Sequence, residues 1–403
     1  MKFAKYLTKG DRGIWGIVLF LSFISIVEVY SAAGLSKLFD HLIFIGIGYV
    51  GIVFLSNINF RVFSKLSLYG YYFAIITLVA ALVSYFFFDT STDGAGRWVK
   101  IGDNIKFQPS EYTKVLLIVY VAALIEKYKD TLQSKETFKK LLISIAIPCG
   151  LILPQNFSTA AMLFLCCFTM LFLGKVSKKY MRLLTIIGLL ALAVGGLFVV
   201  KSSNNSKSSS SLEINDNDIF RNDTWGKRIT NWLNYDPKDN TQENIARRAV
   251  ATGGLWIRPG NTIQGRMLNE SHNDFIYAVI IEELGTFIGI FILSLYSVLF
   301  YRCIIIANKC KNIFCALTVS GLGLIIYLQA LINMGVAVGY LPVTGQTLPF
   351  VSYGGSSFLF FSCFAIGIIQ SISKTTRKQE QLEKEPTNVE TEITDSINQN
   401  TEQ

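Results

Sequence analysis

The chain has 403 residues, of which 51% are hydrophobic and only 16% are charged, with a net charge of +9 and a mean hydropathy of +0.42. Soluble domains carry about 25% charged residues, so this composition excludes a soluble protein and indicates one that crosses the membrane many times. The basic residues form short clusters between apolar runs, which is typical of cytoplasmic loops and argues against nucleic-acid binding.

Disulfide and metal chemistry find little support in the residue types. The seven cysteines lie in apolar runs or in one basic loop, so the sequence predicts no disulfide framework. The two histidines, His41 and His272, are too few for a histidine metal cluster. We predict no cofactor, with a divalent cation left open.

Apolar runs long enough to cross a bilayer recur along the chain. They cover residues 14–33, 41–57, 69–88, 111–126, 139–154, 158–174, 181–200, 274–297, 313–336 and 353–373. Ten spans put both termini on one side, and the Lys/Arg-rich connections then face that same side, as expected for the cytoplasm. The sequence thus predicts an all-α polytopic protein: a ten-helix membrane domain over 1–373 and a disordered cytoplasmic tail over 374–403.

Three polar segments fall on the opposite, extracytoplasmic face: residues 89–110, the large loop 201–273, and residues 338–352. The large loop begins with a Ser/Asn-rich tract that is typical of a flexible linker. Further along, Trp225, Ile229 and Trp232 recur at helical spacing. This pattern indicates a helix that either lies on the membrane surface or packs on the protein itself.

The fourth predicted span begins with Gln-Pro-Ser-Glu at residues 108–111. Ser110 is a suitable helix N-cap, and Glu111 falls in the first turn, where the helix dipole favours a carboxylate. Lys114 is three residues further and can pair with Glu111 on the same helix face. The spacing alone leaves open whether this is a local ion pair or part of a substrate site. Arg97, in the glycine-rich turn just before, offers another cation.

Residues 269–285, N-E-S-H-N-D-F-I-Y-A-V-I-I-E-E-L-G, join the large loop to the eighth span. Asp274 lies where the loop meets the membrane, near a helix N-terminus that stabilises a carboxylate. Glu282 and Glu283 follow about 12–14 Å along the expected helix. In hydrocarbon each charge costs about 2.5–3.5 kcal/mol unless it is partnered or hydrated. We therefore expect these carboxylates to serve a function, although Asp274 could simply cap its helix.

Polar motifs at several helix ends therefore converge on one face of the bundle. The cations Arg97, Lys114, Arg258 and Arg266 can neutralise a phosphate there, and Asp274 can act as a base. The sequence contains no P-loop, no H-E-x-x-H and no G-x-S-x-G, which disfavours nucleotide hydrolysis and peptidase chemistry. The residues by themselves predict an outward-facing site for an anionic headgroup.

Four segments in a fixed order resemble the SEDS family of bacterial cell-wall proteins, whose main branches are FtsW and RodA. They are R-W-V-K-I-G, Q-P-S-E-Y-T-K, the block around Asp274, and L-P-V-T-G-Q-T-L-P-F-V-S-Y-G-G-S-S. The resemblance spans about residues 10–373, and P-G-N-T-I-Q and T-G-Q-T-L-P are closer to the FtsW branch.

This resemblance implies a SEDS-type bundle in the bacterial inner membrane that polymerises lipid II into glycan strands during cell division. It implies a class B penicillin-binding protein as transpeptidase partner, together with other membrane proteins of the division complex. By motif match Asp274 is the catalytic residue. We predict Arg97, Glu111, Lys114, Gln264, Arg266 and Ser271 as the substrate-binding residues. A lipid II transporter, an elongation polymerase of the RodA type, and a scaffold without activity are the alternatives.

The chain departs from the family pattern in three places. Asn156 and Ser158 stand where the family often has an acidic residue and a glycine, so we assign that turn no catalytic role. The glycine-rich run at 253–260 is shortened, and Asn269 replaces a common proline. These changes affect loop geometry, whereas Asp274 and its flanks are intact.

Overall fold

The structure, a computed structural model, describes residues 10–87, 99–101, 105–186, 188, 228, 232, 241–257, 267–268, 273–353, 355 and 357–401. Its elements are α2 (Arg12–Asn57), α3 (Phe60–Phe87), β1 (Val99–Ile101), β2 (Ile105–Phe107), α4 (Pro109–Lys127), η1 (Lys129–Thr131), α5 (Lys135–Ile152), α6 (Phe157–Leu173), α9 (Gln242–Thr252), α10 (Ile276–Lys309), α11 (Ile313–Ala337), η3 (Ser357–Cys363) and α12 (Phe364–Thr401). The predicted all-α class is confirmed, with one short antiparallel hairpin pairing Val99 with Phe107.

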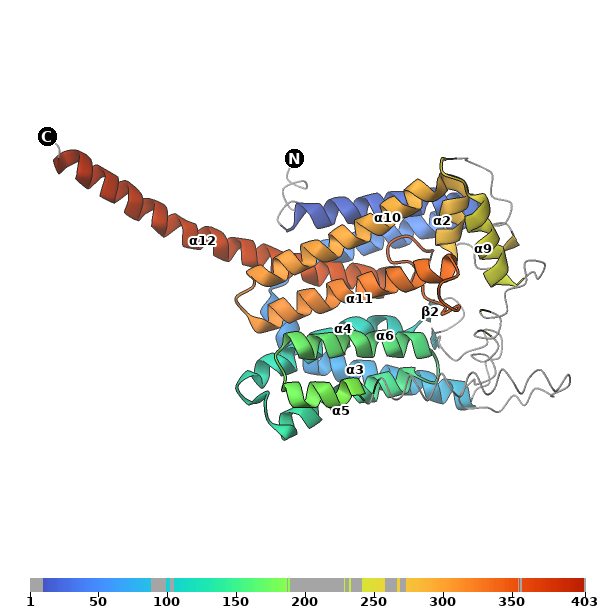
Figure 1. Ribbon diagram of the computed structural model, residues 1–403, viewed down its shortest axis with the longest axis horizontal. Helices are drawn as coiled ribbons and strands as arrows, with labels where there is room; N and C mark the ends of the chain where they lie inside the picture. Colours follow the sequence, from blue (N-terminus) through green and yellow to red (C-terminus); the bar gives the residue numbers. More distant parts are fainter. Residues whose placement is uncertain are drawn as a thin grey trace.

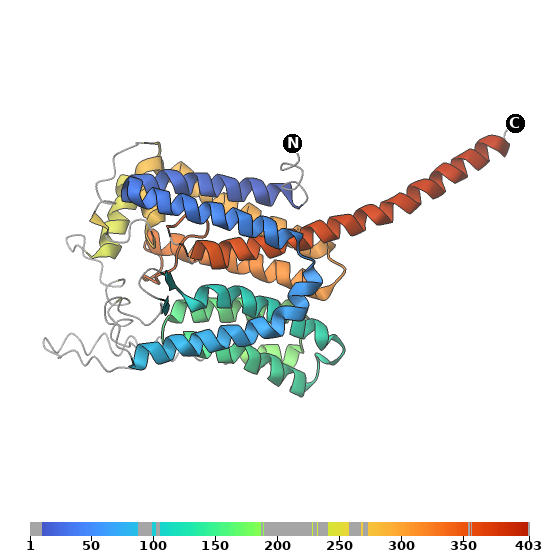
Figure 2. The same cartoon turned by 180° about the vertical axis from the view of Figure 1, so that it is seen from behind.

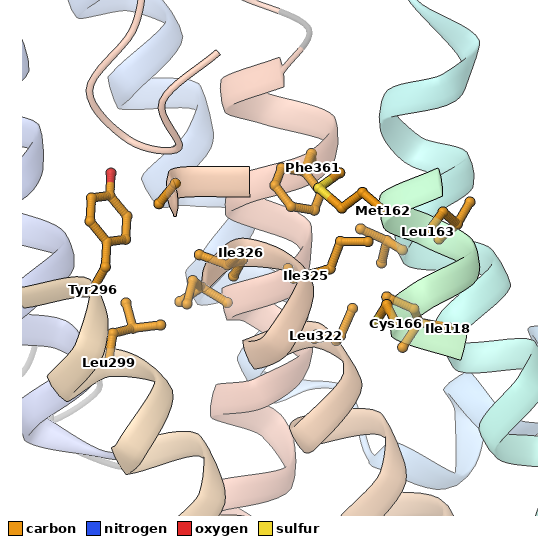
Figure 3. Packing of buried hydrophobic residues seen from close by; sticks show 14 of the residues in the cluster. Ile118, Met162, Leu163, Cys166, Tyr296, Leu299, Leu322, Ile325, Ile326 and Phe361 are labelled. Atoms are coloured by element: carbon orange, nitrogen blue, oxygen red, sulfur yellow. The ribbon is translucent and has the colours of Figure 1, made fainter. Parts of the chain in front are cut away.

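The helices lie side by side in one bundle, with α11 at its centre (Figure 1). Helix α11 packs against α4, α6, α9, α10 and α12. Figure 3 shows Leu322, Ile325 and Ile326 of α11 between side chains of α10 on one side and of α4 and α6 on the other. A helix surrounded in this way needs apolar side chains all round, which explains its lack of an amphipathic pattern.

Helix α2 is a hairpin of two spans rather than one long rod. Gly34 interrupts the helix with φ 76° and ψ −177°, a conformation that glycine adopts without a Cβ penalty. The two arms run side by side (Figure 2), and Ser25 on the first arm lies 2.6 Å from the Nε2 atom of His41 on the second. The predicted spans 14–33 and 41–57 correspond to these two arms.

Helix α10 is also interrupted, and here the sequence prediction of a continuous helix is wrong. Gly285, at φ 83° and ψ 164°, separates a short first segment that ends with Glu282, Glu283 and Leu284 from the long span beyond. A Cβ on Gly285 would lie 2.7 Å from the carbonyl oxygen of Leu255. Both the backbone N–H and the hydroxyl of Thr286 donate to the carbonyl of Gly254, at 3.0 and 2.8 Å. The residues that follow α9 therefore pack directly against the break.

Six helices in the described part of the chain are long and apolar enough to cross a membrane. They are Arg12–Ser31, Lys37–Asn57, Phe60–Val83, Ile276–Lys309, Ile313–Ala337 and Ser357–Leu382. The shorter helices α4, α5 and α6 pack among them. Most of the predicted span 181–200 lies outside the described residues, so the total of ten remains a prediction.

Helix α12 leaves the bundle and extends to Thr401 (Figure 1). The sequence predicted a disordered tail over 374–403, and the helical backbone of residues 374–401 departs from that prediction. Residues 378–385 read K-Q-E-Q-L-E-K-E. These residue types have high helix propensity, whereas the prediction of disorder rested on the lack of apolar side chains.

The bundle has two ends. At the Asp11 end, defined by the starts of α2, α3 and α11, the Asp11 carboxylate lies 3.3 Å from Arg377 and 3.6 Å from Arg302. At the Asp274 end lie the starts of α4 and α10, the end of α11 and the segment 338–352. The candidate active site is built at the Asp274 end.

Candidate active site

The segment 338–352 folds back into the bundle and holds the neighbouring helices together. The hydroxyl of Tyr296 on α10 donates to the carbonyl of Pro349. Ser25 of α2 donates to the carbonyl of Val351 at 2.6 Å. Because α2 and α10 are thereby bonded to one buried loop, that loop fixes their positions at the Asp274 end.

Two further side chains, Asn333 and Ser352, fix the backbone that carries Asp274. Asn333 on α11 donates from Nδ2 to the carbonyl of Asp274 at 2.8 Å and to the carbonyl of Gln346 at 2.7 Å. Ser352 donates to the carbonyl of Asn273 at 2.7 Å and accepts the N–H of Leu348 at the same distance. The main chain at 273–274 is thus clamped from two sides.

Asp274 lies in a turn and is half-buried, while the residues after it are buried. Helix α10 begins at Ile276, and Phe275 occupies the N-cap position. Asp274 therefore stands one position before the cap rather than in it. This placement weakens the interpretation that the carboxylate only caps the helix.

Lys114 and Glu111 form a buried charged centre in the first turns of α4. The Nζ atom of Lys114 lies 3.0 and 3.1 Å from the two carboxylate oxygens of Glu111 and 2.6 Å from Oε1 of Gln329. It also lies 4.0 Å from the centroid of the Phe361 ring. An ammonium group has three N–H donors, and these three oxygens can accept all of them.

The predicted pair of Glu111 and Lys114 is confirmed, and Glu111 is in the first turn as expected. The prediction that Ser110 caps the helix is wrong: Gln108 occupies the N-cap and Pro109 begins the helix. Proline at the first helical position has a suitable fixed φ and loses no helical hydrogen bond there. The predicted contact of Lys114 with substrate stays a prediction, and its side chain is 0% exposed here.

Gln329 and Asn333 connect this charged centre to Asp274. They lie four residues apart on α11, so they share one face of the helix. Gln329 accepts from Lys114 and donates to the carbonyl of Thr347 at 3.0 Å, while Asn333 holds Asp274. Sequence reasoning did not single out these two amides. The available signal was two carboxamides, one turn apart, inside an otherwise apolar span.

The turn before α6 joins the same loop. Asn156 caps α6 by accepting the N–H of Thr159 at 3.2 Å. The hydroxyl of Thr159 accepts from Nε2 of Gln346 at 2.7 Å. Asn156 therefore fills the capping role that an aspartate would also fill, because the two cap helices about equally well.

The other predicted substrate-binding residues, Arg97, Gln264, Arg266 and Ser271, lie outside the described residues. In the sequence, Arg97 is two residues before Val99, the first residue of the β1–β2 hairpin that leads into α4. Among the residues that the structure does describe, no group of three or more His, Cys, Asp or Glu side chains could hold a metal ion.

The large loop rests on the segment 338–352 where the structure describes it. Arg228 donates to the carbonyl of Val343 at 3.1 Å, and the indole of Trp232 donates to the carbonyl of Gly339 at 2.8 Å. These bonds favour a helix that packs on the protein over one that lies free on the membrane. Glu243, at the start of α9, has its pKa raised by burial, while Arg247 and Arg228 oppose the shift.

Comparisons with known proteins agree on one family. The family model FTSW_RODA_SPOVE, described as "Cell cycle protein", matches residues 11–378. A protein of Coxiella burnetii named "Probable peptidoglycan glycosyltransferase FtsW" is 31% identical over 346 residues, which cover 83% of this chain and 86% of that protein. "Stage V sporulation protein E" of Bacillus subtilis is 30% identical over 381 residues, which cover 90% of this chain and 96% of that protein.

Two solved structures share the fold. One belongs to a study of "polymerization and crosslinking by a peptidoglycan synthase complex"; it has a TM-score of 0.71 at 22% identity and covers 91% of this chain and 98% of that one. The other is the rod shape determining protein RodA of Thermus thermophilus. It has a TM-score of 0.63 at 23% identity, and the match covers 91% of this chain and 97% of that one. Since the family model covers nearly the whole sequence, the chain belongs to the FtsW/RodA/SpoVE family of multi-pass membrane proteins.

Proposed function

We propose that this protein is a peptidoglycan glycosyltransferase of the FtsW type, which polymerises lipid II into glycan strands at the division site of the bacterial inner membrane. The names of its relatives support this activity. The observation that carries the proposal within the structure is the clamp on the main chain at 273–274 by Asn333 and Ser352. Such a clamp holds a half-buried carboxylate in a fixed position, as a general base requires.

In the proposed reaction, the C4 hydroxyl of one lipid-linked sugar attacks the anomeric carbon of another. A glycosidic bond forms, the bond from the anomeric carbon to the diphosphate breaks, and the lipid diphosphate leaves. Asp274 takes the hydroxyl proton. A positioned base typically contributes about 10²–10⁴-fold to such a step.

The leaving diphosphate needs cations nearby. We assign this task to Arg97 and Arg266, because they are cations in the polar segments on the Asp274 face, and we assign Gln264 and Ser271 to the binding of the headgroup. Lys114 and Glu111 act as positioning residues, because the Lys114 ammonium already meets three oxygens within the protein. Their effect on Asp274 passes through Gln329, the segment 338–352 and Asn333. No resident cofactor enters this scheme, and a divalent cation bound to the diphosphate remains compatible with it.

The partners in this proposal are lipid II, the growing glycan strand, a class B penicillin-binding protein and further membrane proteins of the division complex. The structural likeness to a chain of a peptidoglycan synthase complex supports the transpeptidase partner. Both termini face the cytoplasm, in accord with the Lys/Arg-rich connections at the Asp11 end.

A lipid II transporter is the second candidate, because the membrane interior contains unusual carboxylates. Glu28 is 0% exposed in the first span, and no described side chain or backbone group donates to either of its carboxylate oxygens. Carboxylates within a membrane often mark transport or proton pathways.

Purified protein with labelled lipid II separates these functions. Polymer formation in detergent supports the glycosyltransferase, whereas translocation in vesicles without polymer supports the transporter. Adding the transpeptidase partner in a parallel reaction tests the proposed partnership, because a partner should raise the polymerisation rate.

A further inference from the structure

A cavity of about 310 Å³ opens at the Asp11 end, far from the candidate active site. It lies where α3 and α11 begin, where α4 ends, and beside α12. Its lining residues are Phe60, Arg61, Ser64, Lys65, Glu126, Asn312 and Gln379. Neither the proposed reaction nor the family comparison assigns it a role.

Two cations that no described side chain neutralises lie on one wall of this cavity. Arg61 and Lys65 are four residues apart on α3 and therefore project from the same helix face. Across the described part of the chain, neither side chain forms a hydrogen bond or an ion pair. Neighbouring cations at this end are neutralised: Arg302 and Arg377 pair with Asp11, and Lys309 lies 3.0 Å from Glu380.

The remaining lining groups also favour an anion. Helix α11 begins at the cavity, so the positive end of its dipole faces this region. The hydroxyl of Ser64 and the carboxamide of Gln379 can donate hydrogen bonds. Glu126 is the one carboxylate in the lining, so the charges there sum to +1 for Arg61, Lys65 and Glu126 together.

The outer surface beside Arg61 and Lys65 is apolar and belongs to a span. Leu66 is 54% exposed and Tyr69 is 72% exposed on the same stretch of α3, and the membrane-crossing part of α3 begins at Phe60. The cavity thus opens at the depth of lipid headgroups, directly beside a surface that faces acyl chains. A soluble anion would use only the cavity, whereas a phospholipid would contact both surfaces.

We propose that this cavity binds the phosphate of an anionic phospholipid, with Arg61 and Lys65 as its charged ligands. Basic pockets between spans on the cytoplasmic side are a known form of lipid recognition. The site is independent of the proposed catalytic activity, because its residues lie at the opposite end of the bundle.

The test is a lipid titration followed by native mass spectrometry of the full-length protein in detergent, with phosphatidylglycerol and phosphatidylcholine as probes. Each Lys or Arg near an anionic lipid strengthens its binding about fivefold, so Arg61→Gln with Lys65→Gln should weaken phosphatidylglycerol binding at least roughly tenfold. The matched control is Lys178→Gln with Lys179→Gln, which removes two exposed charges from the start of the helical stretch 178–186 at the same end. Its phosphatidylglycerol binding should equal that of the wild type.

Glu126→Gln gives a change of opposite sign, because removing the one lining carboxylate should strengthen phosphatidylglycerol binding severalfold. Phosphatidylcholine binding should be weak in all variants. Inorganic phosphate at the lipid's own concentration should not displace the lipid. Equal losses in the two double variants, no loss in either, or displacement by inorganic phosphate would each overturn the proposal.

Discussion

The interior of this protein contains two buried regions with ionisable side chains, and they differ in how their polar atoms are partnered. Around Lys114, every donor of the ammonium meets an oxygen of Glu111 or Gln329. Around Glu28, both carboxylate oxygens lack a donor in the part of the chain that the structure describes. Both side chains are 0% exposed, so burial alone does not distinguish the two regions.

The difference lies in what each region is connected to. The Lys114 centre continues through Gln329 and the segment 338–352 to Asn333 and Asp274. Glu28 shares a helix face with Ser31, which donates to Glu283 just before the break in α10. A satisfied network fixes one geometry, whereas an unpartnered carboxylate holds nothing in place. We therefore expect stability to depend on Lys114 far more than on Glu28.

The largest stability effect is expected for Lys114→Met. This change leaves the Glu111 carboxylate buried without its partner, which costs about 3–5 kcal/mol. The unfolding midpoint of the detergent-solubilised protein measures the loss. Lys127→Met, at the exposed end of the same helix, should have little effect.

A second variant shows whether the loss comes from the stranded charge. Combining Lys114→Met with Glu111→Gln removes both charges and should recover much of the stability. If Lys114→Met unfolds no more easily than Lys127→Met, the charged centre is not a structural support.

Asn333→Leu should affect activity more than stability. It leaves the carbonyls of Asp274 and Gln346 without their shared donor, at about 1–3 kcal/mol. A shift of the catalytic carboxylate by about 1 Å can cost about 100-fold in rate, so polymerisation should fall roughly 10- to 100-fold. The measurement is the polymerisation rate per folded molecule.

Thr318→Val on the same helix is the matched control, because the Thr318 hydroxyl is buried and has no partner among the described residues. It should retain normal activity. A fully active Asn333→Leu protein would show that the clamp on Asp274 is dispensable.

Glu28→Gln should have the smallest effect, within about 1 kcal/mol of the wild-type stability. No described group donates to the Glu28 carboxyl oxygens, so replacement by an amide of the same shape breaks no hydrogen bond that the structure describes. The measurement is the thermal unfolding midpoint of Glu28→Gln, compared with those of the wild type and of Lys114→Met. A loss as large as that of Lys114→Met would mean that Glu28 holds an essential partner.

The sequence predicted which residues form the site better than it predicted the hydrogen bonds that link them. Asp274, Glu111 and Lys114 were identified because charged residues at the ends of apolar runs are costly and therefore informative. The pairing of Glu111 with Lys114 followed from their spacing. The break at Gly34 falls between the predicted spans 14–33 and 41–57. The break at Gly285 could not be separated from an ordinary helical glycine, because many glycines in membrane helices serve close packing.

Hydrogen bonds between residues far apart in the chain cannot be predicted from local sequence patterns. Gln329 and Lys114 are 215 residues apart, and their contact depends on how α4 and α11 pack. Glu28 was not identified either, although it is the one carboxylate within the apolar run 14–33. Glu28, Gln329 and Asn333 share one sequence signal, which is a polar side chain inside an apolar span.

The proposed mechanism requires Asp274 to be the catalytic base and the main chain around it to fix its position. Asp274→Asn tests this most directly, because the amide keeps the shape of the side chain and removes the basic carboxylate. The control is Asp130→Asn, an exposed aspartate at the other end of the bundle. Both proteins are compared with the wild type in polymerisation of labelled lipid II, at matched amounts of folded protein. We predict that Asp130→Asn is fully active, and that Asp274→Asn folds normally but loses about 10²–10⁴-fold in rate. Substantial glycan synthesis by folded Asp274→Asn protein would contradict the account.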